Sequence, residues 1–266
     1  MSDARTNQRE RLVALEGALN WRDLGGYPTA DGRVTKWDRI YRSDGLDQLT
    51  DADLDVIAEL GIKLVIDFRV DREVDGNPSR LADHPELRCQ RLPIGGDEVE
   101  GKSILDVIRA GELKTYTIDD MAATYERLLE DFAPTFGEVI EHAADPANHP
   151  MVFHCTAGKD RTGLMAMLLL GALGVSDDDI VADYELTTHY RSNKRLAVLG
   201  PELEKVGVDL ETVRPFLTAQ APVMAATVAR LHRDHGSTEA FLTSKAQVEP
   251  ATLARLRHEL LEFVKP

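Results

Sequence analysis

Cysteine is scarce in this chain, which has only Cys89 and Cys155 among its 266 residues. Two thiols cannot build a disulfide framework, so the composition fits a reducing compartment and leaves each cysteine free to be a small apolar side chain or a reactive thiol. The eight histidines are scattered without the spacing of metal ligands. We therefore expect neither a metal ion nor another cofactor.

Positive charge and long apolar runs are also lacking. The chain has 31 Lys and Arg against 46 Asp and Glu, a net charge of −15, so no general attraction to nucleic acid or to an anionic membrane is expected. The longest apolar run, 164–175, is too short to span a bilayer, and the polar segment 1–11 lacks the apolar core of a secretory signal. These absences predict a cytoplasmic protein without an integral membrane segment, in which any anionic substrate would have to be bound by a local positive site.

The remaining pattern is that of a globular α/β chain. Apolar residues make up 43% and charged residues 29%, and no repeat or linker divides the sequence, which predicts a single domain over 1–266. The run 62–68 (IKLVIDF) is typical of a strand buried on both faces of a parallel sheet, and 87–94 and 151–154 are further candidate strands. With a helix over 119–144 between the last two, the order predicts a central, mostly parallel sheet flanked by helices, with ligands at the carboxyl ends of its strands.

Helix signals surround these strands. Thr50 is a candidate N-cap for a helix that ends before Gly61, and Ser176 is a candidate N-cap for a helix towards Arg191. Further helices are predicted over 162–173, 223–235 and 250–264, and two short strand-like pieces over 33–41.

The segment 191–222 mixes apolar and charged residues at helical spacing, which predicts an amphipathic helix pair. Such a pair could be a lid over the active site, with Gly200-Pro201 and Pro215 as hinges, or an ordinary helical subdomain packed on the sheet.

The most informative stretch is 151–163, MVFHCTAGKDRTG. Cys155 directly follows the carboxyl end of a short apolar strand, and a helix begins close to Arg161. The backbone amides of the intervening loop and the positive end of the helix dipole would surround one point, which makes an oxyanion-sized site suited to phosphate. The same field stabilises a thiolate, so Cys155 is a candidate nucleophile. The loop residues expected to bind the phosphate are Thr156, Ala157, Gly158 and Lys159.

Four neighbouring side chains have candidate roles. The planar fork of Arg161 can bind two phosphoryl oxygens, and the Thr162 hydroxyl can hydrogen-bond the sulfur when it leaves in a second step. We expect His154 to order the loop through hydrogen bonds. Lys159 either adds positive charge for a doubly phosphorylated or inositol-bearing substrate or is a solvated loop lysine. Cys89, by contrast, is expected to be buried and inert.

These residues resemble the cysteine-dependent protein tyrosine phosphatase superfamily, whose signature H-C-x5-R-[ST] matches 154–162. More narrowly, the chain is similar to the bacterial tyrosine-protein phosphatase family that includes the mycobacterial PtpB-type enzymes. The further stretches that carry this resemblance are Asn20-Trp21-Arg22-Asp23-Leu24-Gly25-Gly26, Tyr41-Arg42-Ser43, Val65-Ile66-Asp67-Phe68-Arg69 and Glu73. The resemblance implies a tyrosine-phosphatase-like fold with a lid, and a two-step hydrolysis through a phosphocysteine.

The general acid is left open, because no Trp-Pro-Asp loop is present. Asp160 is the first candidate, since it lies in the phosphate loop near the leaving-group oxygen, although it could merely tune that loop. Asp97 on a glycine-rich loop is the second candidate. Asp67 is a third, for which a structural pairing with Arg161 or Arg69 is the favoured interpretation.

Together these observations predict a phosphomonoesterase of the tyrosine or dual-specificity class. Its substrate would be a phosphorylated protein, a phosphoinositide or a small phosphate ester, and the sequence does not indicate an oligomeric state. A rhodanese-like sulfurtransferase would also use a loop cysteine, but it leaves the 161–163 sequence Arg-Thr-Gly unexplained. An inactive phosphate-binding module is the other alternative, and such modules normally lose the cysteine or the arginine.

Overall fold

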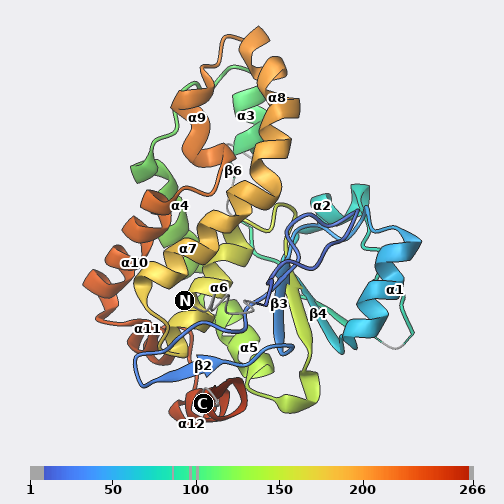
Figure 1. Ribbon diagram of the computed structural model, residues 1–266. Helices are drawn as coiled ribbons and strands as arrows, with labels where there is room; N and C mark the ends of the chain where they lie inside the picture. Colours follow the sequence, from blue (N-terminus) through green and yellow to red (C-terminus); the bar gives the residue numbers. More distant parts are fainter. Residues whose placement is uncertain (1–8, 86, 96–97, 100–101, 264–266) are drawn as a thin grey trace, which may run out of the picture.

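A five-stranded sheet lies at the centre of the computed structural model, which describes residues 9–85, 87–95, 98–99 and 102–263 (Figure 1). The strand order is β1-β3-β8-β4-β5. Strands β3, β8, β4 and β5 run parallel, and only the short β1 is antiparallel to its neighbour β3. The predicted α/β fold with a mostly parallel sheet is therefore confirmed. The five strands are β1 (Arg22–Asp23), β3 (Ile40–Ser43), β4 (Leu64–Asp67), β5 (Arg88–Arg91) and β8 (Met151–His154).

Helices lie on both sides of this sheet (Figure 1). α1 and α2 lie on one side of the strands in this view, most other helices lie on the opposite side, and α3, α8 and α9 gather at the top. The helices are α1 (Asp51–Leu60), α2 (Asp71–Gly76), α3 (Ile104–Arg109), α4 (Ile118–Asp131), α5 (Ala133–Ala143), α6 (Asp160–Ala172), α7 (Asp177–Thr187), α8 (Asn193–Lys205), α9 (Leu210–Leu217), α10 (Ala221–His235), α11 (Thr238–Ser244) and α12 (Pro250–Leu260), with a 3₁₀ turn at Pro146–Asn148 and a π-helical turn at Thr188–Ser192.

The central strands face two separate apolar cores. Ile66 and Phe153 belong to the larger core, which also holds the apolar faces of α4, α5 and α6. Val65 and Val152 point the other way, into a smaller core with Ile57 of α1. Every residue of β4 and β8 is buried, so burial on both faces explains why these strands are apolar without alternation. Among the described helices, none is both long and apolar enough to cross a membrane.

Local signals determine the ends of α1 as predicted. The Thr50 hydroxyl accepts a hydrogen bond from the Asp53 amide at 3.2 Å, and the Asp53 carboxylate accepts one from the Thr50 amide at 2.9 Å. Gly61 ends the helix at φ 64°, in the left-handed region that glycine adopts without strain.

The prediction of one helix over 119–144 is wrong. The chain forms α4 and α5 instead, with Phe132 between them at φ −117° and ψ 20°. Pro134 follows in the first turn of α5, where its missing amide proton breaks no hydrogen bond inside that helix. The apolar spacing continues across the break because both helices pack on the same core.

The prediction for the C-terminal helix needs correction, whereas the two strand-like pieces over 33–41 are confirmed as β2 (Arg33–Thr35) and β3. The helix expected over 250–264 stops at Leu260, and β9 (Leu261–Phe263) follows and pairs antiparallel with β2. The two strand-like pieces of 33–41 therefore belong to different sheets, because β3 lies in the central sheet. Helix α11 was not predicted. The remaining two-stranded sheet joins β6 (Glu98–Val99) and β7 (Lys102–Ser103).

The segment 191–222 is helical as predicted, and the residues proposed as hinges lie inside its helices. The π-helical turn continues α7 into α8, with Gly200 and Pro201 inside α8 and Pro215 inside α9. The chain instead reverses at 206–209, where Gly207 has φ +75°. Glycine at that turn supplies the left-handed backbone that the reversal requires.

Candidate active site

The carboxyl ends of three parallel strands meet at the site. The register pairs His154, the last residue of β8, with Ser43 of β3 and with Asp67 of β4. Two backbone hydrogen bonds extend this arrangement beyond the strands: the Phe68 amide donates to the His154 carbonyl at 2.9 Å, and the Gly45 amide donates to the Thr156 carbonyl at 3.1 Å. Cys155 therefore lies between the segments that follow β3 and β4.

Cys155 begins a loop that leads directly into α6. The cysteine is buried, and Lys159, which precedes the first turn of α6, provides no side-chain cap. Within the described chain, the backbone amides of residues 156–160 donate no hydrogen bond to another residue. Open amides beside the positive end of a helix form a cradle that can bind an anion the size of phosphate.

Gly158 fixes the shape of this loop. Its φ is +62°, and a Cβ atom there would lie 2.7 Å from the Ser43 carbonyl oxygen and 2.8 Å from Asn20 Nδ2. Its own carbonyl oxygen accepts hydrogen bonds from Asn20 Nδ2 at 3.0 Å and from Arg42 Nη2 at 2.8 Å. A side chain at this position would push the loop off its two donors, so only glycine fits here.

Those two donors belong to a buried polar network. Arg42 and Arg22 both pair with the Asp183 carboxylate, whose pKa is lowered, against the effect of burial, by the charges of both arginines. Arg22 also hydrogen-bonds Asn20. The network therefore connects the segments around Asn20 and Arg42, which carry the resemblance described above, to the loop that follows Cys155.

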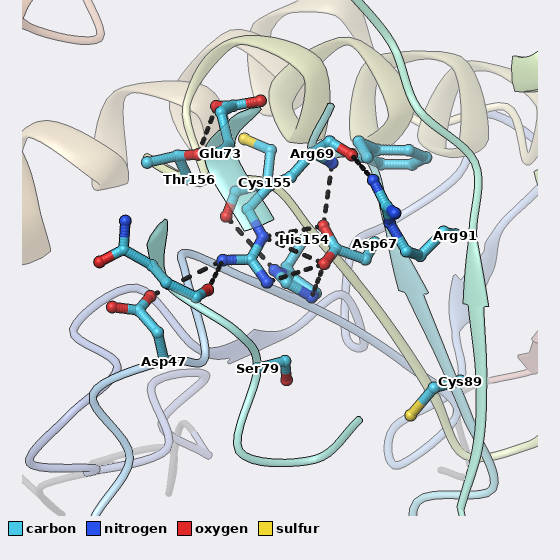
Figure 2. Close-up of polar contacts among 12 residues, drawn as sticks. Asp47, Asp67, Arg69, Glu73, Ser79, Cys89, Arg91, His154, Cys155 and Thr156 are labelled. Carbon is cyan, nitrogen blue, oxygen red and sulfur yellow. Dashed lines mark hydrogen bonds and ion pairs between the residues drawn. The ribbon is translucent and has the colours of Figure 1, made fainter. Parts of the chain in front are cut away.

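Arg161 is held by a residue to which the sequence analysis gave no role. Its Nη1 and Nη2 donate to the two carboxylate oxygens of Glu73 at 2.6 and 2.7 Å, and the Thr156 hydroxyl donates to Glu73 at 2.5 Å. Figure 2 shows Glu73 beside Thr156 and Cys155. Although burial opposes it, the contacts with Arg161 and Thr156 lower the pKa of Glu73 to about 2, so this carboxylate fixes the guanidinium plane at neutral pH.

Asp67 pairs with Arg69 and not with Arg161. Its carboxylate accepts from Arg69 Nε at 3.0 Å and from Nη2 at 2.8 Å (Figure 2). His154 Nε2 lies 3.7 Å from Asp67, and its Nδ1 lies 3.3 Å from the Cys155 carbonyl oxygen. Burial lowers the pKa of His154. His154 thus has one hydrogen-bond contact with the loop, at the Cys155 carbonyl oxygen, and its ordering role stays a prediction.

Asp160 is the first residue of α6. Its Oδ1 accepts a hydrogen bond from the Tyr125 hydroxyl at 2.6 Å and lies 3.2 Å from Lys159 Nζ. Together with Arg161 and Phe216 it lines a small cavity. Asp160 is therefore the acid candidate that the structure brings beside Arg161. Asp97, the second candidate, lies outside the described residues.

Lys159 is not the solvated lysine that one interpretation expected, since only 3% of it is exposed. Its Nζ donates to the Phe216 carbonyl oxygen of α9 and lies 5.3 Å from the centre of the Phe216 ring. Thr162 is buried too, and its hydroxyl has no hydrogen-bond partner among the described residues. Through the contact of Phe216 with Lys159, the segment 191–222 reaches the loop that follows Cys155.

Cys89 corrects another expectation, because it is exposed on the edge strand β5 and not buried. Its thiol donates to the Leu81 carbonyl oxygen at 3.1 Å. Because β5 is at the edge of the sheet and its four residues are exposed or only partly buried, a cysteine in this strand is not covered by a neighbouring strand. Across the described chain, no three His, Cys, Asp or Glu side chains are grouped as metal ligands.

Residues 13–262 match the model of the tyrosine phosphatase family, so this chain belongs to that family. It is accordingly a hydrolase of the tyrosine and dual-specificity phosphatase class. Among its relatives, a Cupriavidus necator protein assigned as a tyrosine-protein phosphatase is 32% identical over 229 residues, covering 85% of this chain and 81% of the relative. The tyrosine-protein phosphatase of Nostoc commune is 37% identical over 153 residues, 58% of this chain and 49% of the relative. The triple specificity protein phosphatase PtpB of Mycobacterium tuberculosis is 30% identical over 241 residues, 82% of this chain and 80% of the relative.

Proposed function

We propose that Cys155 is the nucleophile of a two-step phosphomonoester hydrolysis. Its thiolate attacks phosphorus, the bond between phosphorus and the ester oxygen breaks, and the alcohol leaves from a phosphocysteine. Water then attacks this intermediate, releasing phosphate and regenerating the thiolate. The observation that carries the proposal is the position of Cys155 at the end of β8, within a loop of open amides that leads into Arg161.

The surrounding groups have separate tasks in this scheme. The amides of residues 156–160 and the guanidinium of Arg161 bind the phosphoryl oxygens, whose charge must be stabilised in both transition states. Glu73 is a positioning residue, because its contact with Arg161 sets the plane of the fork. The Thr162 hydroxyl would hydrogen-bond the sulfur in the second step.

Asp160 protonates the leaving oxygen and then removes a proton from the attacking water. Its support is its place at the first residue of α6, next to Arg161, and its hydrogen bond from Tyr125, which fixes the carboxyl group. Because Asp160 is already fixed beside the phosphate-binding loop, the enzyme would not need a separate mobile loop to bring in a general acid.

Phosphotyrosine in proteins is the proposed main substrate, with phosphoserine, phosphothreonine and phosphoinositide as further ones. The name of the mycobacterial relative, a triple specificity protein phosphatase, supports this breadth. The segment 191–222 would act as a lid, since Phe216 of α9 covers Lys159. A thiolate enzyme with two cysteines would operate in the cytoplasm, where thiols stay reduced.

A leaving-group series tests this scheme. Wild-type protein and the Asp160→Asn variant are assayed in EDTA on phosphotyrosine, phosphoserine and aryl phosphates whose alcohols range from weakly to strongly acidic. The wild type should hydrolyse them with EDTA present. Asp160→Asn should slow the hydrolysis of phosphotyrosine on the order of a hundredfold or more. It should slow the hydrolysis of the ester with the most acidic alcohol only several-fold, because a good leaving group needs no proton.

Asp119→Asn is the matched control, because Asp119 is an exposed acid on α4 that pairs with Arg230. Asp119→Asn should hydrolyse every ester of the series at a rate within about twofold of the wild-type rate. Equal slowing of every ester by Asp160→Asn would assign this residue to loop ordering, and loss of wild-type activity in EDTA would contradict the metal-independent scheme.

A further inference from the structure

A cavity of about 780 Å³ opens next to the catalytic loop, with Thr156 and Glu73 in its lining. One wall is cationic and comes from α3, the π-helical turn and α8. The other wall comes from the segments 16–19 and 44–50. The cationic side chains of the first wall are Arg109, Arg191, Lys194 and Arg195. This wall has no assigned part in the hydrolysis of one phosphate at Cys155.

Most of the acids in this cavity already have partners. Asp44 accepts from Arg191 Nε at 2.8 Å, Glu73 pairs with Arg161, and Asp47 lies 3.9 Å from Arg69. Glu16 is the remaining carboxylate of the lining, and it belongs to the segment 16–19. The wall of α3 and α8 is therefore left with an excess of positive charge.

Arg195 is the most unusual member of this wall. It is only partly exposed, and the described part of the chain offers its guanidinium neither a hydrogen bond nor an ion pair. Burial, and then the charges of Arg191 and Arg109, lower its pKa to about 10, and the charge of Asp160 opposes this shift. A partly buried cation among other cations is unfavourable unless an anion joins it.

The position of this arginine relative to the loop is fixed by its helix. Arg191 lies in the π-helical turn just before α8. Its guanidinium donates hydrogen bonds to Asp44 and, at 3.4 Å, to the Thr156 carbonyl oxygen. Arg195 follows about one helical turn later. Arg109 ends α3, which packs against α8 (Figure 1), and its Nη1 lies 3.8 Å from Asp106 Oδ1. The two guanidiniums therefore face one cavity that also reaches the catalytic loop.

We propose that Arg195 and Arg109 form a second anion subsite, which binds a second phosphate group of the substrate while the first is hydrolysed at Cys155. This inference rests on the proposed function and narrows its substrates to molecules that carry two phosphates. A phosphate monoester carries a charge of about −1.5 to −2 and three acceptor oxygens, which matches two guanidinium forks. A carboxylate would neutralise only one of them.

The test compares matched pairs of synthetic esters: hydroquinone bisphosphate with para-methoxyphenyl phosphate, and the longer biphenyl bisphosphate with biphenyl monophosphate. The readout is the ratio of kcat/KM between the bisphosphate and the monophosphate of each pair, halved for the two equivalent phosphates. For at least one pair, the wild type should prefer the bisphosphate by about tenfold, the gain expected from one charge-assisted contact.

Arg195→Gln should lower that ratio at least about fivefold, and Arg195→Lys should retain part of it, because lysine keeps the charge without the fork. Lys205→Gln is the matched control, since it removes one positive charge from an exposed position of α8 that does not line the cavity. It should leave the ratio within about twofold of wild type. Arg109→Gln provides the same measurement if Arg195→Gln does not fold.

Equal kcat/KM for both members of both pairs in the wild type would overturn the subsite. An equal loss of kcat/KM on the monophosphate and the bisphosphate in Arg195→Gln would also overturn it. That result would indicate that Arg195 acts through the charge of Asp160 and not on a second phosphate. Failure of the proposed function is distinguishable from both results, because the wild type would then release phosphate from none of the four esters.

Discussion

Cys155→Ser should abolish phosphate release while leaving phosphate binding intact. The serine hydroxyl is not ionised at neutral pH, so the two-step reaction loses its nucleophile, and turnover should fall on the order of 10⁴-fold or more. The amides of residues 156–160 and the guanidinium of Arg161 are unchanged by this substitution, so the anion cradle stays in place. The measurements are steady-state hydrolysis of a phosphotyrosine peptide and calorimetric binding of inorganic phosphate.

Cys89→Ser is the matched control, because it replaces the exposed thiol on β5. It should retain activity within about twofold of wild type, as surface substitutions usually do. Residual turnover by Cys155→Ser at more than a few per cent of the wild-type rate would remove Cys155 from the nucleophile's role.

Arg161→Lys should slow hydrolysis by about 30-fold to 1000-fold, which corresponds to about 2 to 4 kcal/mol of transition-state stabilisation. Lysine keeps the positive charge, but it cannot make the paired contact with both carboxylate oxygens of Glu73 or present a fork to two phosphoryl oxygens. Because the phosphoryl charge spreads in the transition state, the loss should fall mainly on kcat.

Arg80→Lys serves as the control for this substitution, since Arg80 pairs with the exposed Asp51 at the start of α1. It should change kcat by less than about twofold. If Arg161→Lys kept nearly full activity, a point charge would be sufficient and the fork geometry set by Glu73 would have no catalytic importance.

The centre of the site was predictable because its geometry follows from a short, continuous stretch. An apolar strand, a loop with Gly158 and a helix starting near Arg161 are all encoded within about a dozen neighbouring residues, although Asn20 and Arg42 also hold the loop. The buried strand β4 and the ends of α1 were predictable for the same reason, since their signals lie within a few neighbouring residues.

What could not be predicted depends on contacts between distant segments. Glu73 reaches Arg161 only because β4 and β8 are neighbours in the sheet, and the burial of Lys159 depends on Phe216 of α9. Likewise, β9 forms because β2 offers it a partner, although the sequence around Leu261 continues a helical pattern. Local propensity could not anticipate such tertiary pairings.

The most direct test of the account is to look for the phosphocysteine itself. Wild-type protein turning over a phosphotyrosine peptide in EDTA is quenched in acid within milliseconds, digested, and analysed by mass spectrometry. The account predicts one added phosphoryl group, carried on the sulfur of Cys155 and absent from Cys155→Ser. A phosphoryl group on any other residue, or rapid turnover of the wild type with no phosphoenzyme at any quench time, would contradict it.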